Sequence, residues 1–173
     1  MNGQQARAIK ADQKYYGVAV ALVAEVEGDA AREGRVKLTF PWFDPTAVTD
    51  WCRVAQLYAG NGYGSLWVPE KDDEVLVGFV MGDMREPIVL GGLYNGQDKP
   101  PSHRAADRDQ KLFRTKAGHQ IEFDDKAGTV TIATQSGTTV TLAESKITLK
   151  ARDIEIVADG GDVTVSGRKI RLN

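Results

Sequence analysis

The sequence has few of the residues on which disulfides and metal sites depend. It contains one cysteine, Cys52, and two histidines, His103 and His119. A single cysteine excludes an intrachain disulfide framework, and we expect Cys52 to be a small buried hydrophobe because it lies in an alternating apolar stretch. Neither histidine has a second His or Cys at ligand spacing, so we predict no metal and no cofactor.

Long apolar runs are missing as well. No segment approaches the ~18 consecutive apolar residues that suggest a membrane span. Residues 1–14 are polar and lack the apolar core of a signal peptide. We therefore expect a protein that is made in the cytoplasm and reaches any other place without a signal peptide.

An excess of positive charge is also absent. The net charge is −2, and residues 112–173 carry 9 of the 22 basic and 8 of the 24 acidic side chains, which leaves −3 for the rest of the chain. Neither part has the basic stripe with which a protein displaces counterions from nucleic acid. We expect no nucleic-acid partner.

Catalytic motifs are lacking too. The glycine-rich stretch 60–64 is not followed by Gly-Lys-Ser/Thr, so it predicts a tight loop rather than a phosphate site. The acidic runs 72–74 and 124–125 lie beside turns, where aspartate is common. Ser65 and Ser102 lack the Gly-x-Ser-x-Gly context of an activated nucleophile. We expect no enzymatic activity and assign no catalytic residue.

What the sequence does contain is a short repeat in its last third. Each unit has two apolar residues around one polar residue, with turn-forming residues between units. The units are Ile121-Glu122-Phe123, Val130-Thr131-Ile132, Val140-Thr141-Leu142, Ile147-Thr148-Leu149, Ile154-Glu155-Ile156, Val163-Thr164-Val165 and Ile170-Arg171-Leu172. Such alternation predicts strands with one buried face and one solvated face.

These units are too small to bury their apolar face alone. Each contributes only two inward side chains, and a lone narrow ribbon is marginal in water. Three copies wound about one axis would make a closed prism, which we favour over a two-layer sandwich within one chain. The predicted trimer core is the apolar set Ile121, Phe123, Val130, Ile132, Val140, Leu142, Ile147, Leu149, Ile154, Ile156, Val163, Val165, Ile170 and Leu172.

The preceding part predicts a small barrel. Five apolar or alternating stretches with turn signals between them are expected to be strands: 15–27, 34–40, 51–58, 74–81 and 87–94, with a loop at 44–50. This favours a five-stranded OB barrel. The predicted organisation of this all-β chain is a tail (1–14), a barrel (15–95), a linker (96–111) and a spike (112–173).

An ordered series of motifs resembles a known family. The series comprises Gly34-Arg35-Val36-Lys37-Leu38, Pro41-Trp42, Trp51-Cys52-Arg53-Val54-Ala55-Gln56, Ala59-Gly60-Asn61-Gly62-Tyr63-Gly64, the stretch 69–79, the stretch 83–96, and Arg114 to Asp125. It resembles phage baseplate assembly protein V and the related spikes of contractile injection and type VI secretion systems. The resemblance covers residues 15–173.

The resemblance implies a structural, membrane-piercing central spike, built into a virion baseplate or a contractile injection particle. It implies three OB barrels in a collar, followed by an intertwined triple-stranded β-helix. The linker is too short for the lysozyme domain of some relatives, and no His-x-His iron site is present. The resemblance also implies a separate hub protein at the barrel end. A tip protein of the proline-alanine-alanine-arginine repeat type is expected at Ile170, Arg171, Leu172 and Asn173.

A binding module is the alternative. OB barrels hold single-stranded nucleic acid or oligosaccharide on aromatic side chains interspersed with basic ones. The aromatic residues available for this are Trp42, Phe43, Trp51, Tyr58, Tyr63 and Trp67. The −3 charge of the part that contains them argues against nucleic acid.

Overall fold

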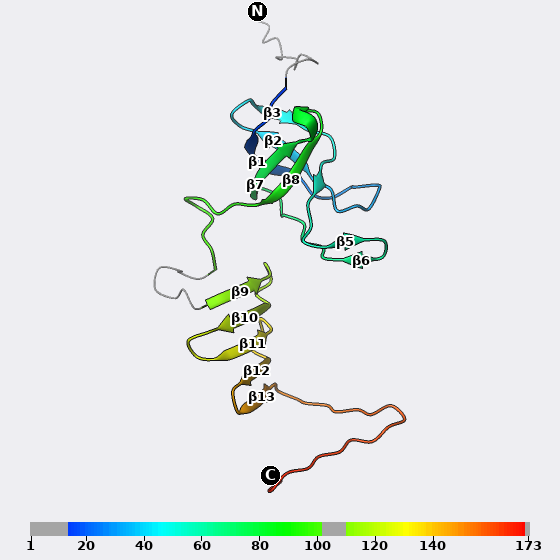
Figure 1. Cartoon of the computed structure of the whole chain (residues 1–173), viewed down its shortest axis with the longest axis vertical. Helices are drawn as coiled ribbons and strands as arrows, with labels where there is room; N and C mark the ends of the chain where they lie inside the picture. Colours follow the sequence, from blue (N-terminus) through cyan, green and yellow to red (C-terminus); the bar gives the residue numbers. More distant parts are fainter. Residues whose placement is uncertain (1–13, 102–109, 172–173) are drawn as a thin grey trace, which may run out of the picture. The chain divides into compact units, whose positions relative to one another are not determined.

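The chain is built from strands and short connections. A computed structural model describes residues 14–101 and 110–171. The described residues contain one 3-10 turn, η1 (Val80–Gly82), and no α-helix, which confirms the predicted all-β class; nothing in them forms a helix suited to crossing a membrane. The chain divides into two compact units, Met1–Lys99 and Pro100–Asn173, and Figure 1 shows the strands of each.

The first unit is a small barrel. Its main sheet has the order β3-β2-β1-β7-β8-β4, made of β1 (Val18–Glu25), β2 (Lys37–Phe40), β3 (Asp44–Val48), β4 (Arg53–Val54), β7 (Glu74–Phe79) and β8 (Pro87–Gly92). β4 is parallel to β8, and the other pairs are antiparallel. A bridge between Val36 and Cys52 joins the segments just before β2 and β4. This bridge closes five strands into a ring, as the sequence predicts.

Alternate residues of these strands fill the barrel. The buried side chains are Ala19, Ala21, Val23, Val36, Leu38, Phe40, Cys52, Val75, Val77 and Val89. Across the central pair, Ala21 faces Val75 and Ala19 faces Val77. Cys52 is buried as expected, its thiol donates to the Asp50 carbonyl at 3.1 Å, and burial raises its pKa. The unit therefore has a core of its own.

Several predicted strand bounds are wrong. The segment expected as a loop at 44–50 contains β3, and Asp44 Oδ1 accepts hydrogen bonds from the Thr46 amide and hydroxyl there. The strand expected at 51–58 is only Arg53–Val54. The glycine-rich stretch is a two-stranded hairpin, β5 (Ala59–Gly60) and β6 (Tyr63–Gly64), in keeping with the tight loop expected there.

The second unit is an antiparallel meander, which we call the ladder. It runs β13-β12-β11-β10-β9, with β9 (Gln110–Arg114), β10 (Gln120–Asp124), β11 (Thr129–Ala133), β12 (Thr139–Ala143) and β13 (Lys146–Lys150). Every strand pairs with its neighbour in the same chain. β9 begins inside the segment predicted as linker, so the ladder contains one strand that the repeat does not indicate.

The ladder turns use a repeated threonine-glycine design. The hydroxyl of Thr115 accepts a hydrogen bond from the His119 amide at 3.1 Å, and that of Thr134 accepts one from Thr138 at 3.2 Å. Gly118 has φ of 90° and Gly137 of 88°. Glycine adopts this left-handed conformation without steric cost. Consecutive strands are therefore joined by short turns with a fixed register.

Candidate assembly surface

The ladder gathers apolar side chains on one face. Because side chains alternate along a strand, the register sets two apolar rows across it. The first row is Phe113, Ile121, Ile132, Val140 and Leu149, and the second, beside Lys111, is Phe123, Val130, Leu142 and Ile147. These rows contain the first eight residues of the predicted trimer core. We call this surface the ladder face.

The ladder face is open in the single chain. None of the described residues from 110 to 171 is buried. Ile121 is 42% exposed, Leu142 43% and Ile147 69%. A contiguous exposed apolar surface of this kind marks a site of interaction with another surface. The ladder face is therefore the strongest candidate for an assembly surface in this unit.

The opposite face is polar. Its central row consists of Leu112, Glu122, Thr131, Thr141 and Thr148. The Thr131 and Thr141 hydroxyls lie 3.4 Å apart, within hydrogen-bond distance. Cross-strand threonine pairs add a few tenths to about 1 kcal/mol to a sheet relative to alanine. The ladder thus has one face suited to water and one suited to burial.

The described residues of the last three repeat units do not form strands. Residues 151–171 have no strand assignment, although the sequence predicts strands at 154–156, 163–165 and 170–172. Ile154, Ile156, Val163, Val165 and Ile170 are 52% to 69% exposed. The segment adds no strand to the free edge of β13, the last strand of the ladder. Of the expected tip-binding residues, Arg171 is exposed too, whereas Leu172 and Asn173 lie outside the described residues.

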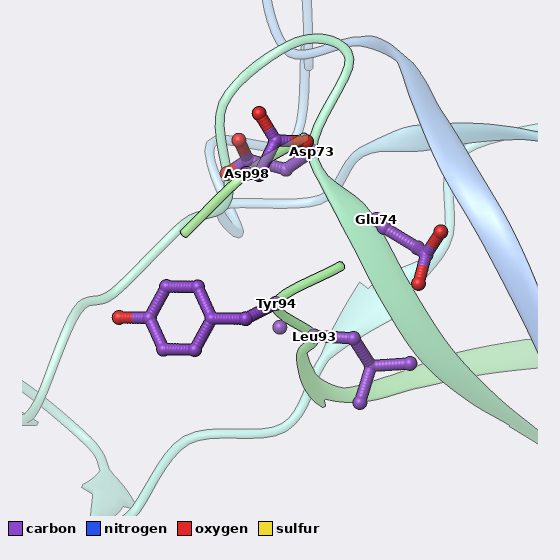
Figure 2. A pocket seen from close by; sticks show the side chains of 6 residues that line it. Asp73, Glu74, Leu93, Tyr94 and Asp98 are labelled. Carbon is purple, nitrogen blue, oxygen red and sulfur yellow. The ribbon is translucent and has the colours of Figure 1, made fainter. Parts of the chain in front are cut away.

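The barrel carries a pocket of about 290 Å³ that is lined by Asp73, Glu74, Gly92, Leu93, Tyr94 and Asp98. Figure 2 shows the Tyr94 ring pointing away from the carboxylates of Asp73 and Asp98. The Asp73 carboxylate accepts the Glu70 amide at 2.8 Å, and that of Asp98 accepts the Asn95 side chain at 3.1 Å. A pocket lined by three carboxylates and no cation does not suit a phosphate backbone.

The aromatic residues considered for an OB ligand site do not share one surface. Trp42 and Phe43 belong to a cluster with Tyr15 in which ring centroids are about 6 Å apart. Trp51 lies under the ammonium group of Lys37, at 5.0 Å, and Tyr58 and Tyr63 lie on the β5–β6 hairpin. A stacking platform needs successive rings along one groove. Among residues 14–101 and 110–171, these rings therefore provide no single aromatic platform for the ligand-binding alternative.

The remaining polar candidates stay dispersed. In the part of the chain that the structure describes, no three His, Cys, Asp or Glu side chains gather as a metal site would require. His119 lies in a ladder turn, where its Nδ1 accepts the Gln135 amide at 3.4 Å, and His103 lies outside the described residues. Asp124 accepts the Ala127 amide at 2.8 Å, which gives it a turn-forming role.

Comparison with known proteins identifies the barrel. Residues 19–94 match the family described as the type VI secretion system/phage-baseplate injector OB domain. Those residues run from the second position of β1 to just beyond β8. The match therefore covers the closed barrel and stops before the ladder.

Longer matches connect the chain to spike proteins. It is 32% identical over 122 residues to the type VI secretion system spike protein VgrG3 of Vibrio cholerae, covering 62% of this chain and 12% of that protein. It is equally identical over 124 residues to the actin cross-linking toxin VgrG1 of Vibrio cholerae (65% and 11%). The same identity extends over 130 residues of the spike protein VgrG2a of Pseudomonas aeruginosa (66% and 15%).

The chain thus spans a small part of the length of these relatives, and the actin cross-linking in the name of one of them is a property of that protein. Two of these three relatives are named as type VI secretion system spike proteins, and the description of the matching family names the same secretion system. Residues 19–94 are therefore a domain of the type VI secretion system/phage-baseplate injector OB domain family, and the chain is a distant homologue of the VgrG spike proteins.

Proposed function

We propose that this chain is the central spike subunit of a phage baseplate or contractile injection particle and works as a homotrimer. The observation that carries the proposal is the ladder face, two apolar rows that a single chain leaves exposed. Three such faces turned toward one axis bury one another and leave the threonine-rich faces in water. Membership of the baseplate injector OB family supports the assignment to such a particle.

The two parts of the C-terminal unit contribute differently to this trimer. Residues 110–150 pair within the chain, so each copy supplies one wall of the prism. Residues 151–171 have no strand partner among the described residues of their own chain, and buried backbone groups need partners. This segment therefore winds with the same segment of two other copies, and the intertwined β-helix begins after Lys150.

The function is mechanical rather than enzymatic. A prism in which the backbone is paired throughout transmits force along its axis to the target envelope. A separate hub protein holds the barrel end of the spike. The chain needs no cofactor for this role, and its net charge of −2 gives it no attraction to nucleic acid.

The trimer is tested by light scattering after size exclusion of the whole chain. The expected mass is three times the chain mass of 18.8 kDa. The reason is that the ladder face cannot be covered in a monomer. A monomeric mass at micromolar concentration would contradict the proposal.

The far end of the spike is the proposed site for a conical tip protein of the proline-alanine-alanine-arginine repeat type. Ile170 is 53% exposed and Arg171 is exposed beside it, and Leu172 and Asn173 complete the proposed site. An apolar layer at the end of a repeat stack needs a cap. Arg171→Glu, which lies outside the predicted trimer core, should weaken binding of a tip protein encoded beside this gene, measured by co-purification, whereas Lys169→Glu should not. Equal binding by both trimeric variants would exclude this site.

A further inference from the structure

The β5–β6 hairpin and its flanks form a segment without charge. Residues 55–68 contain no Asp, Glu, Lys or Arg, although charged residues make up 27% of the chain. We call this segment the uncharged arm. Figure 1 shows the hairpin extending away from the barrel strands. Exposed loops of soluble proteins are normally polar or charged, so a projecting segment without charge needs an explanation.

The uncharged arm is held in one shape. The Tyr58 and Tyr63 rings lie 5.2 Å apart, and a Cβ at Gly60 would come within 2.3 Å of the Tyr63 ring. At the base, Gln56 donates to the Trp67 carbonyl at 3.1 Å and accepts the Trp67 amide at 2.8 Å. Preorganisation of this kind lowers the entropy cost of binding a partner.

The arm nevertheless exposes large apolar side chains. Leu57 is 87% exposed, Leu66 73%, Tyr58 64% and Tyr63 60%. Depletion of charge and enrichment in aromatic residues are the composition of the buried centre of a protein–protein interface. A two-stranded hairpin is also marginal in water by itself. The arm therefore has the composition and shape of an interface element.

The same barrel carries a second uncharged surface. On the outside of β1, β7 and β8 lie Val18, Val20, Leu76, Ile88 and Leu90, which we call the outer barrel face. Val18 is 54% exposed, Val20 42% and Leu90 48%. Antiparallel sheets commonly present polar side chains on their outer side, and the first charged residue on this face of β7 is Glu74. β1 is thus apolar on both sides, as in a covered strand.

We propose that the uncharged arm of one copy packs on the outer barrel face of the next copy. This inference rests on the proposed trimer. A ring of identical subunits uses a head-to-tail interface, which requires two different patches on each molecule. This chain carries two such patches on one barrel, and neither has a charge that would lose its hydration on contact. The partner of the arm is therefore a second copy of this chain.

The test is photo-crosslinking in the full-length protein. Leu57 is replaced by benzoylphenylalanine, the protein is irradiated, and the products are separated on a denaturing gel. A link between copies has twice the mass of the chain, and we expect its peptide map to join position 57 to β1, β7 or β8. The same probe at Lys71, an exposed position outside both surfaces, should give no such link.

A second pair of variants tests the outer barrel face. Leu90→Arg places a charge on that face and should remove the link from position 57, whereas Ala47→Arg on β3 should leave it unchanged. Three results overturn the inference but leave the proposed trimer standing, provided that the protein is a trimer. They are a link from position 57 only within its own chain, a link to another protein, and a link to another part of the neighbouring copy. A monomer by light scattering overturns both.

Discussion

At the scale of single residues, two aspartates shape the barrel loops in the same way. Asp29 accepts hydrogen bonds from the Ala31, Glu33 and Arg35 amides and from the Arg35 guanidinium group, whose closest nitrogen is 2.7 Å away. Asp83 similarly accepts the amide and guanidinium group of Arg85. These bonds favour the charged carboxylate and lower both pKa values.

The lowered pKa of Asp29 should make the stability of the barrel sensitive to acid. Its pKa falls from an ordinary 3.8 to about 2, chiefly because Arg35 donates to it. The folded state therefore binds fewer protons than the unfolded state in this range, so the stabilisation is present above pH 3.8 and disappears as the pH falls toward 2. Asp29→Asn should lower barrel stability at neutral pH and flatten its dependence between these pH values, measured by denaturant unfolding followed by tryptophan fluorescence.

The matched control is Asp98→Asn, which changes a carboxylate that contacts the Asn95 side chain and no arginine among the described residues. It should leave the acid dependence in place. An Asp29→Asn protein with the wild-type pH profile would show that Arg35 does not hold this loop. Sequence alone could not identify Asp29, because an Asp after Gly28 is an ordinary turn residue until the fold brings Arg35 back to it.

At the scale of elements, the segments predicted as strands fall into two groups: those that pair within the chain and those that form no strand in the structure. The sequence predicted the alternating barrel strands and the four ladder strands that carry a repeat unit, because side-chain alternation depends only on local order. It missed β3, whose Asp44-Pro45 start is typical of a turn, and β9, whose Lys-Leu-Phe core puts two apolar residues on opposite faces. It also placed strands in 151–171, a segment that forms no strand in the structure.

A pair of neighbouring substitutions tests the assembly of that segment. Ile156, which is 69% exposed in the single chain, points to the axis in the proposed trimer, and Glu155 points to water. Ile156→Asp should prevent assembly because three carboxylates would be buried together, at a cost of several kcal/mol each. Glu155→Lys should assemble normally. Light scattering distinguishes the two, and equal damage would mean that the faces of this segment are assigned wrongly.

At the scale of the whole molecule, the two units obtain their stability from different sources. The barrel has buried side chains in its own strands, including Leu38, Val75 and Val77. The described residues of the second unit include none that is buried. The barrel can thus bury a core as a single copy, whereas in the proposed trimer the ladder obtains its buried contacts from other copies. The sequence could not predict this difference, because apolar and polar residues alternate in both units. Only the strands of the barrel close into a ring that buries its apolar side chains.

Thermal unfolding of the full chain should therefore show two transitions with different concentration dependence. Dissociation of the ladder yields three chains from one particle, so its midpoint should rise with protein concentration. Barrel unfolding does not change the number of separate molecules, whether the ladder is still assembled or already dissociated. The midpoint of barrel unfolding should therefore not depend on protein concentration. All three tryptophans, Trp42, Trp51 and Trp67, lie in the barrel unit. Tryptophan fluorescence consequently reports the barrel, and far-ultraviolet circular dichroism reports both units. A ladder midpoint that is independent of concentration would mean that the ladder face is covered within one chain, and the trimer would lose its physical basis.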